Sequence, residues 1–172
     1  MKKKFTKLIS LVLIVVVLLG IAMPIASASG DAIDQFVTRL YRNILFRESD
    51  SAGFQYWTSV LRNRTQTGAN VAHGFFFSQE FINRRFSNEV FVDTLYMTLM
   101  NRTPDAAGKS HWVGRLNQGW PREDIFAGFV NSVEFDGICN AAGITRGTYT
   151  SAGRRGPYIC NTPVQNNSSK RA

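Results

Sequence analysis

The sequence contains only two cysteines and two histidines, which limits the metal chemistry it can support. Cys139 and Cys160 cannot complete a zinc site without nearby histidines. Neither His73 nor His111 stands in a His-Glu-x-x-His motif. We therefore expect no metal site and no cofactor, and we interpret both histidines as structural or solvated.

Motifs for calcium binding and for catalysis are also missing. The turns at Asp50 and Asp105 lack the alternating acids of a calcium loop. Glu80 with Glu134, or Asp50 with Asp105, would resemble the carboxylate pair of a glycosidase. Each of these acids, however, stands where a helix is predicted to begin. Because a helix start explains them, we expect no catalytic residues and no enzyme.

The repeated part of the chain has no run of basic residues. The net charge is +8, but the first 28 residues contribute four lysines and no acid, which leaves 8 − 4 = +4 for the rest. A charge this small and scattered does not indicate nucleic-acid binding, so we expect no nucleic-acid partner, and a mild positive excess is compatible with an anionic surface such as a cell wall.

Residues 1–28 have the layout of a secretory signal peptide. A lysine-rich start precedes an apolar core from Leu8 to Leu19, and Ala26-Ser27-Ala28 forms a cleavage site. The alternative is an uncleaved anchor, because Leu8 to Ile25 approaches the roughly 18 apolar residues that span a bilayer. Cleavage after Ala28 is favoured, so we expect a secreted or cell-surface protein that contacts the membrane only through this segment.

In an exported chain, Cys139 and Cys160 predict a disulfide. Closing a loop of about 20 residues would contribute roughly 3 kcal/mol. This bond would staple a C-terminal extension in which Ile144 to Tyr149 and Tyr158-Ile159 are candidate extended pieces. The polar residues 162–172 are predicted to be disordered.

The strongest pattern is an internal repeat, since the sequence of Phe91–Phe135 resembles that of Phe36–Phe81. The copies share, in order, Phe-Val, Leu-Tyr, Arg, Asp, Ala-Gly, Trp, Leu, Gly-Phe, Ser and Glu-Phe. A repeat of this period predicts a duplicated structural unit. The chain then divides into a signal peptide (1–28), two repeat units (31–86 and 87–147), and an extension with a tail (148–172).

The pattern in each unit predicts three helices and a short fourth helix, so the expected fold is all-α with the two units packed together. Apolar residues at intervals of three and four trace one face of the first helix, which Asp31 or Asn88 would cap. Gly53 and Gly108 would let another backbone approach the second helix. The later helices begin at Asp50 and Asp105, then at Thr67 and Pro121, then at Ser78 and Ser132.

The aromatic residues suggest a core and one surface contact. Trp57 and Trp112 recur on a helical face and are predicted to be core residues. Trp120 has no counterpart and lies in a Gly-Trp-Pro loop, so it is the better candidate for an exposed contact, with a core-edge position as the alternative. The run Phe75–Phe77 either seats the two units against each other or exposes a partner surface.

These shared residues resemble the bacterial DUF4214 family over about 110 residues. The residues that carry the resemblance in the first copy are Phe36-Val37, Leu40-Tyr41, Leu45, Arg47, Asp50, Ala52-Gly53, Tyr56-Trp57, Gly74-Phe75-Phe76, Ser78 and Glu80-Phe81. The resemblance implies a secreted or surface protein, often with the unit in tandem beside S-layer, calcium-repeat or carbohydrate-active modules. It implies no established activity and no catalytic residue set.

We therefore expect a non-enzymatic interaction module that binds an envelope glycan or a surface protein. The candidate ligand-binding residues are Trp120, Arg47, Asp50, Arg102 and Asp105. The alternatives are a small cell-wall hydrolase that uses carboxylates and a purely structural domain for surface assembly. The sequence sets neither the ligand nor the oligomeric state.

Overall fold

The computed structural model describes residues 31–151, and every regular element in that range is a helix. The first unit contains α2 (Ala32–Arg39), the π-helix η1 (Leu40–Leu45), α3 (Ser51–Arg62), α4 (Gly68–Phe76) and α5 (Gln79–Ile82). The second contains α6 (Asn88–Leu99), α7 (Ala106–Asn117), α8 (Arg122–Val130) and α9 (Val133–Ala141). The all-α prediction is confirmed for these residues. The predicted signal peptide, the Tyr158-Ile159 piece and the polar tail lie outside them.

Between residues 31 and 151, no helix combines the length and the apolar character that crossing a membrane requires.

Most helix starts were predicted correctly, because a side-chain oxygen accepts the N–H three residues further on. The residues that cap in this way are Asp31, Asp50, Thr67, Ser78, Asp105 and Ser132. The prediction that Asn88 caps α6 is wrong, since the hydroxyl of Ser87 accepts the N–H of Val90. Pro121 stands one residue before α8 in an extended conformation instead of opening the helix.

The two first helices end differently. The α2 helix continues directly into η1, where the N–H of Phe46 donates to the carbonyl of Tyr41, five residues earlier. The run then ends because Phe46 adopts a left-handed conformation with φ of 54°. In the second unit α6 keeps α-helical winding, and Asn101 takes the left-handed position with φ of 51°.

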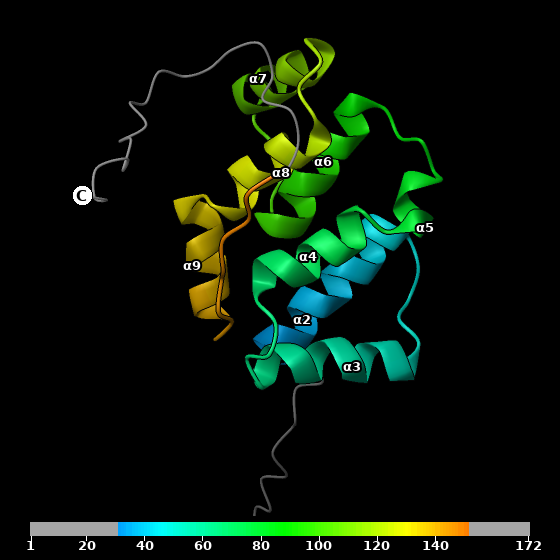
Figure 1. The fold of residues 1–172 in the computed structure, drawn as a ribbon, viewed down its shortest axis with the longest axis vertical. Coiled ribbons are helices and arrows are strands. Elements are labelled where there is room, and N and C mark those ends of the chain that lie inside the picture. The colour runs from blue at the N-terminus through cyan, green and yellow to red at the C-terminus, as the bar shows by residue number, and fades with distance from the viewer. Residues whose placement is uncertain (1–30, 152–172) are drawn as a thin grey trace, which may run out of the picture.

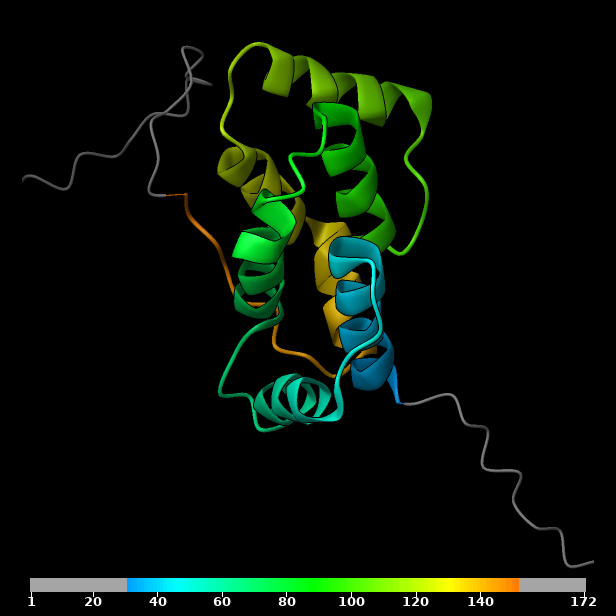
Figure 2. The same ribbon diagram turned by 90° about the vertical axis from the view of Figure 1, so that its right-hand side faces the viewer.

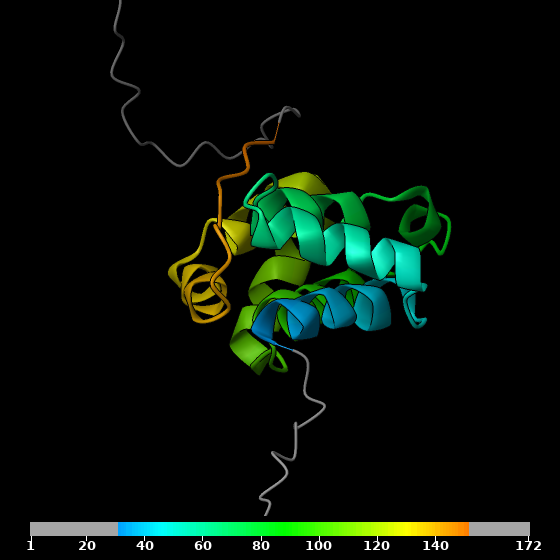
Figure 3. The same ribbon diagram turned by 90° about the horizontal axis from the view of Figure 1, so that it is seen from below.

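The fold is built around these first helices, since η1 packs against α6. The α4 helix packs on η1 and α8 packs on α6, which forms a second layer (Figures 1 and 2). The α3 and α7 helices lie at opposite ends of the body (Figure 2). Viewed from the α3 end, α9 of the second unit lies beside α2 of the first (Figure 3), and the rings of Phe36 and Phe135 are 6.3 Å apart.

One continuous core joins the two units. Phe76, from the first unit, is fully buried and lies 5.9 Å from the ring of Phe91 and 5.6 Å from that of Phe126, both in the second unit. Phe77 also contacts Phe126, at 5.4 Å, whereas Phe75 packs on Tyr41 within its own unit. The aromatic run therefore seats the two units against each other.

Residues 144–151, here named the C-terminal strap, form no strand. Instead they run across the start of α4, where the N–H groups of Gly68 and Ala69 donate to the carbonyls of Thr145 and Arg146 at 2.8 and 2.9 Å. Because the first N–H groups of a helix have no partner within it, the strap satisfies donors that would otherwise need water.

The predicted disulfide staple is not found. Cys139 is a free cysteine whose side chain is fully buried, and Cys160 lies outside the described residues. Cys139 projects from α9 into the core, which explains why its thiol is free. Its sulfur lies so close to the start of α4 that a Cβ added at Gly68 would be 3.0 Å from it. Burial raises the pKa of this thiol to about 12, so it stays protonated and unreactive at neutral pH.

Candidate functional site

The Arg-x-x-Asp turn of the first unit is an ion-pair cluster. The guanidinium of Arg47 binds Glu80 in a bidentate manner, with distances of 3.0 Å from Nε and 3.3 Å from Nη2. It also lies 4.0 Å from Asp50 and 5.1 Å from the centre of the Tyr41 ring. This arrangement, here named the Arg–Glu clasp, ties the turn after η1 to the start of α5.

The second unit repeats the clasp with the equivalent residues. Arg102 binds both carboxylate oxygens of Glu134, at 2.6 and 3.0 Å, and lies 3.9 Å from Asp105 and 4.9 Å from the centre of the Tyr96 ring. The hydrogen bonds from Arg102 hold the pKa of Glu134 below its ordinary value. The sequence interpretation missed Glu80 and Glu134 as partners, although both recur in the same register as the arginines.

The two candidate aspartates act as helix caps in both units. The N–H of Gly53 donates to Asp50, and that of Gly108 donates to Asp105, at 2.8 and 2.9 Å. These bonds lower the pKa of both carboxyl groups. No cluster of three or more potential metal-binding side chains occurs within residues 31–151.

Trp57 and Trp112 do not converge, because α3 and α7 lie at opposite ends of the body (Figure 2). Each ring is half-buried and packs on the aromatic residue of the next helix in its own unit, at 5.4 Å from Phe75 and 5.3 Å from Phe129. Each packs at the edge of its own unit's core.

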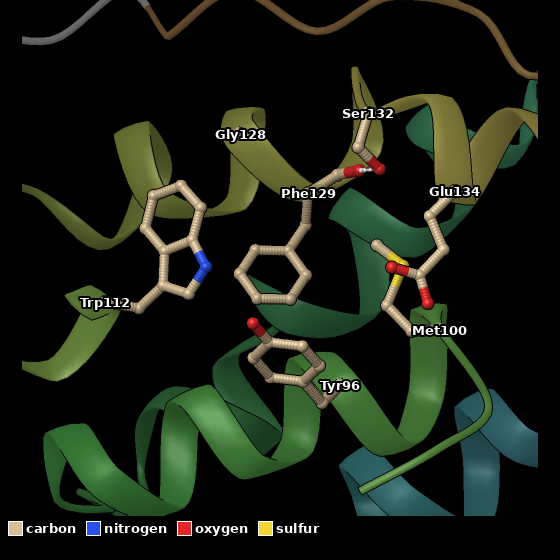
Figure 4. A pocket seen from close by; sticks show the side chains of 7 residues that line it. All are labelled: Tyr96, Met100, Trp112, Gly128, Phe129, Ser132 and Glu134. Atoms are coloured by element: carbon tan, nitrogen blue, oxygen red, sulfur yellow. Dashed lines mark hydrogen bonds between the residues drawn. The ribbon is translucent and has the colours of Figure 1, made fainter. Parts of the chain in front are cut away.

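A small pocket of about 140 Å³ opens beside Trp112 (Figure 4). We name it the aromatic pocket, and it is lined by Tyr96, Met100, Trp112, Gly128, Phe129, Ser132 and Glu134. The close-up shows the three aromatic rings gathered together, with Glu134 and Met100 on the other side of the hollow (Figure 4). The pocket thus combines aromatic walls with a hydroxyl and a carboxylate. The sequence interpretation assigned these aromatic residues to the core and did not anticipate the pocket.

Trp120 is not the exposed contact that the loop sequence suggested. Its ring is partly buried against the core, and the guanidinium of Arg115 lies 4.5 Å from the ring centre. The tryptophan therefore takes the alternative position, at the edge of the core, where the guanidinium of Arg115 lies over its ring.

The histidines belong to packing contacts. His73 stacks on Tyr149 of the C-terminal strap at 4.6 Å, and its Nε2 lies 2.9 Å from the tyrosine hydroxyl. Burial lowers the pKa of His73, which favours the neutral ring. His111 is exposed, and its ring forms a T-shaped pair with that of Trp112, with the ring centres 4.9 Å apart. Neither histidine lies in the aromatic pocket.

Comparison with protein families gives a domain of unknown function, DUF4214, which matches twice, at residues 26–86 and 72–139. The protein belongs to the DUF4214 family. Its two matches agree with two tandem copies of the unit. Searches of curated proteins and of solved structures returned no match.

The glycines of the DUF4214 units serve tyrosine packing, and the prediction of a close backbone at Gly53 and Gly108 is wrong. A Cβ at Gly108 would lie 2.5 Å from the hydroxyl of Tyr96, and a Cβ at Gly53 would overlap that of Tyr41. The missing side chain of Gly108 in the first turn of α7 therefore makes room for Tyr96, the tyrosine whose ring Arg102 covers.

We expect Gly108→Ala to lower the free energy of unfolding by about 1–3 kcal/mol, because the new methyl group displaces Tyr96. Gly114→Ala is the matched control within α7, since a Cβ there meets nothing within 4 Å. It should raise stability by roughly 0.5–1 kcal/mol through helix propensity. Urea unfolding followed by circular dichroism measures both, and equal effects would contradict the packing argument.

Proposed function

We propose that this DUF4214 protein is a non-enzymatic interaction module of the bacterial cell surface that binds an envelope glycan. The aromatic pocket is the observation that carries the proposal. Aromatic rings provide flat apolar faces for the C–H faces of sugars. The Ser132 hydroxyl already donates to the carbonyl of Phe129 and Arg102 binds both oxygens of Glu134, so these two residues offer their remaining acceptor positions to sugar hydroxyls. The signal-peptide pattern of residues 1–28 supports export to the compartment where such glycans occur.

The size of the pocket restricts what it accepts. Its volume of about 140 Å³ is several times the roughly 30 Å³ that one water molecule takes in the liquid. This space suits a substituent that projects from a larger ligand, such as the acetamido group of an amino sugar. The rest of the glycan would then lie on the surface around Trp112 and His111.

The environment of the acids supports binding over hydrolysis. A glycosidase needs one carboxylic acid whose pKa is raised so that it donates a proton near neutral pH. The pKa of Glu134 is lowered by Arg102, and those of Asp50 and Asp105 are lowered by backbone N–H groups. These groups are arranged to stay ionised, which suits a structural or binding role.

Saturation-transfer NMR with chitin oligosaccharides and peptidoglycan fragments tests the proposal. We expect transfer to the acetamido protons, and a loss of affinity of about tenfold or more in Trp112→Ala. Trp57→Ala is the matched control, because it removes the equivalent packing in the first unit and leaves the aromatic pocket intact.

Three outcomes would overturn the proposal: no transfer from any glycan, equal affinity in both variants, or clearing of a peptidoglycan gel that Glu134→Gln abolishes. A pull-down from envelope fractions that recovers protein, together with blank glycan experiments, would assign the module to a protein partner instead.

A further inference from the structure

A second hollow, here named the arginine groove, lies between the first helices of the two units. Its volume is about 380 Å³, and it is lined by Thr38, Arg39, Arg42, Asn43, Met97, Asn101, Arg102 and Thr103. Three of these side chains are arginines, none is an acid, and most of the others end in an amide or a hydroxyl. The lining is thus rich in hydrogen-bond donors and positive charge.

Arg39 is the unusual member of this lining. Its side chain is half-buried, and within the described residues it forms no ion pair with a carboxylate. Its Nε donates to the carbonyl of Thr98 at 3.3 Å, and its guanidinium lies 5.7 Å from the centre of the Phe36 ring. Burial lowers the pKa of Arg39, which shows that its surroundings disfavour the charge.

A charge in such a position normally has a partner, because removing an ion from water is costly unless an opposite charge or hydrogen bonds replace the water. The repeat does not require this arginine, since Thr94 occupies the equivalent position of the second unit. Arg39 therefore lines the groove with a partly desolvated side chain, and neither duplication nor ion pairing explains it.

The other two arginines differ in how firmly they are held. Arg42 also binds Glu48 in a bidentate manner, at 2.9 and 3.2 Å, but both side chains are mostly exposed, at 60% and 73%. Exposed ion pairs typically contribute about 0–1 kcal/mol because water competes for both groups, so an incoming anion can compete with Glu48 for this guanidinium. Arg102 keeps its bidentate bond to Glu134 and adds positive potential to the wall of the groove.

We propose that the arginine groove is a binding site for an anionic group, a phosphate or a carboxylate, with Arg39 as its principal ligand and Arg42 as its second. Guanidinium groups bind both anions through paired, charge-assisted hydrogen bonds. Asn43 and Asn101 supply neutral donors around them. This site lies apart from the aromatic pocket and does not depend on the glycan proposal, although the Arg102–Glu134 pair borders both.

Side-chain NMR tests the proposal on the intact chain. The arginine Nε–H resonances, assigned by their loss in single variants, are followed during titration with inorganic phosphate, with D-glucuronate, and with D-glucose or sodium chloride as controls. We expect the Arg39 and Arg42 resonances to shift saturably with the two anions and to stay unchanged with glucose. The tighter of the two anions identifies the group that the site prefers.

Variants complete the test. Arg39→Gln should weaken anion binding by about tenfold, read from the amides of Thr38 and Asn43, whereas Arg85→Gln removes the same charge from an exposed arginine outside the groove and should change nothing. If Arg39→Gln unfolds, the exposed Arg42→Gln serves in its place, with a smaller loss. Shifts that follow ionic strength at every arginine, or unchanged affinity in the groove variants, would overturn the proposal.

Discussion

Phe76→Ala will lower the free energy of unfolding by about 3–5 kcal/mol, the largest effect expected from any single change in the core. The side chain of Phe76 is 1% exposed and contacts Phe81 in its own unit and Phe91 and Phe126 in the other. Its removal leaves a cavity at the junction that holds the two units together. Urea unfolding measured by circular dichroism gives the change directly.

Phe46→Ala is the control for Phe76→Ala, because that ring is 52% exposed and its loss should cost less than about 1 kcal/mol. The shared core also predicts a single transition in which both units unfold together. Two separate transitions in the wild-type protein would show that the units are stable independently. A loss of unfolding free energy in Phe76→Ala no larger than that in Phe46→Ala would contradict the role of Phe76 at the junction.

Gly147→Ala will have the second largest effect, a loss of about 2–4 kcal/mol, because two costs combine at this position. Gly147 has a left-handed backbone with φ of 73°, which a residue with a Cβ adopts only at a cost. A Cβ there would also overlap Thr67, the residue that caps α4, and would lie 2.8 Å from its Cγ2. The change should therefore detach the strap from the start of α4.

Gly143→Ala separates these two costs. Its φ of 68° is nearly the same, but a Cβ there meets nothing within 4 Å, so only the backbone cost of about 1 kcal/mol remains. Hydrogen exchange at the amides of Gly68 and Ala69, which donate to the strap, should accelerate in Gly147→Ala and not in Gly143→Ala. Equal behaviour of the two variants would contradict the clash with Thr67.

Local rules on the sequence predicted the helices and most of their starts. A cap depends on residues only three positions apart, so Asp50, Asp105, Ser78 and Ser132 were identified without knowing the fold. The sequence does not predict that η1 is a π-helix. The spacing of its buried residues is compatible with an α-helix as well as with a π-helix. The pattern predicts Asn88 as the cap of α6, one residue away from the actual cap Ser87, because Asn and Ser both cap helices and stand side by side here.

Contacts between distant residues were the part that the sequence did not reveal. Arg47 and Glu80 stand far apart in the chain, and the recurrence of both in each copy was attributed to separate turns and helix starts. The depth at which α9 inserts also had no local signature, so Cys139 was assigned to a disulfide although its side chain lies in the core. Arg39 was not predicted as a binding residue, because the second unit has Thr94 and not an arginine at the equivalent position.

The greater length of α9 lets the second unit reach the first unit. In the first unit the fourth helix stops after four residues, whereas α9 has nine and reaches across to Phe36 and Gly68 of the opposite unit. Residues of the second unit thus contact both α2 and the start of α4, so the last helix of the chain fastens the first unit at two places.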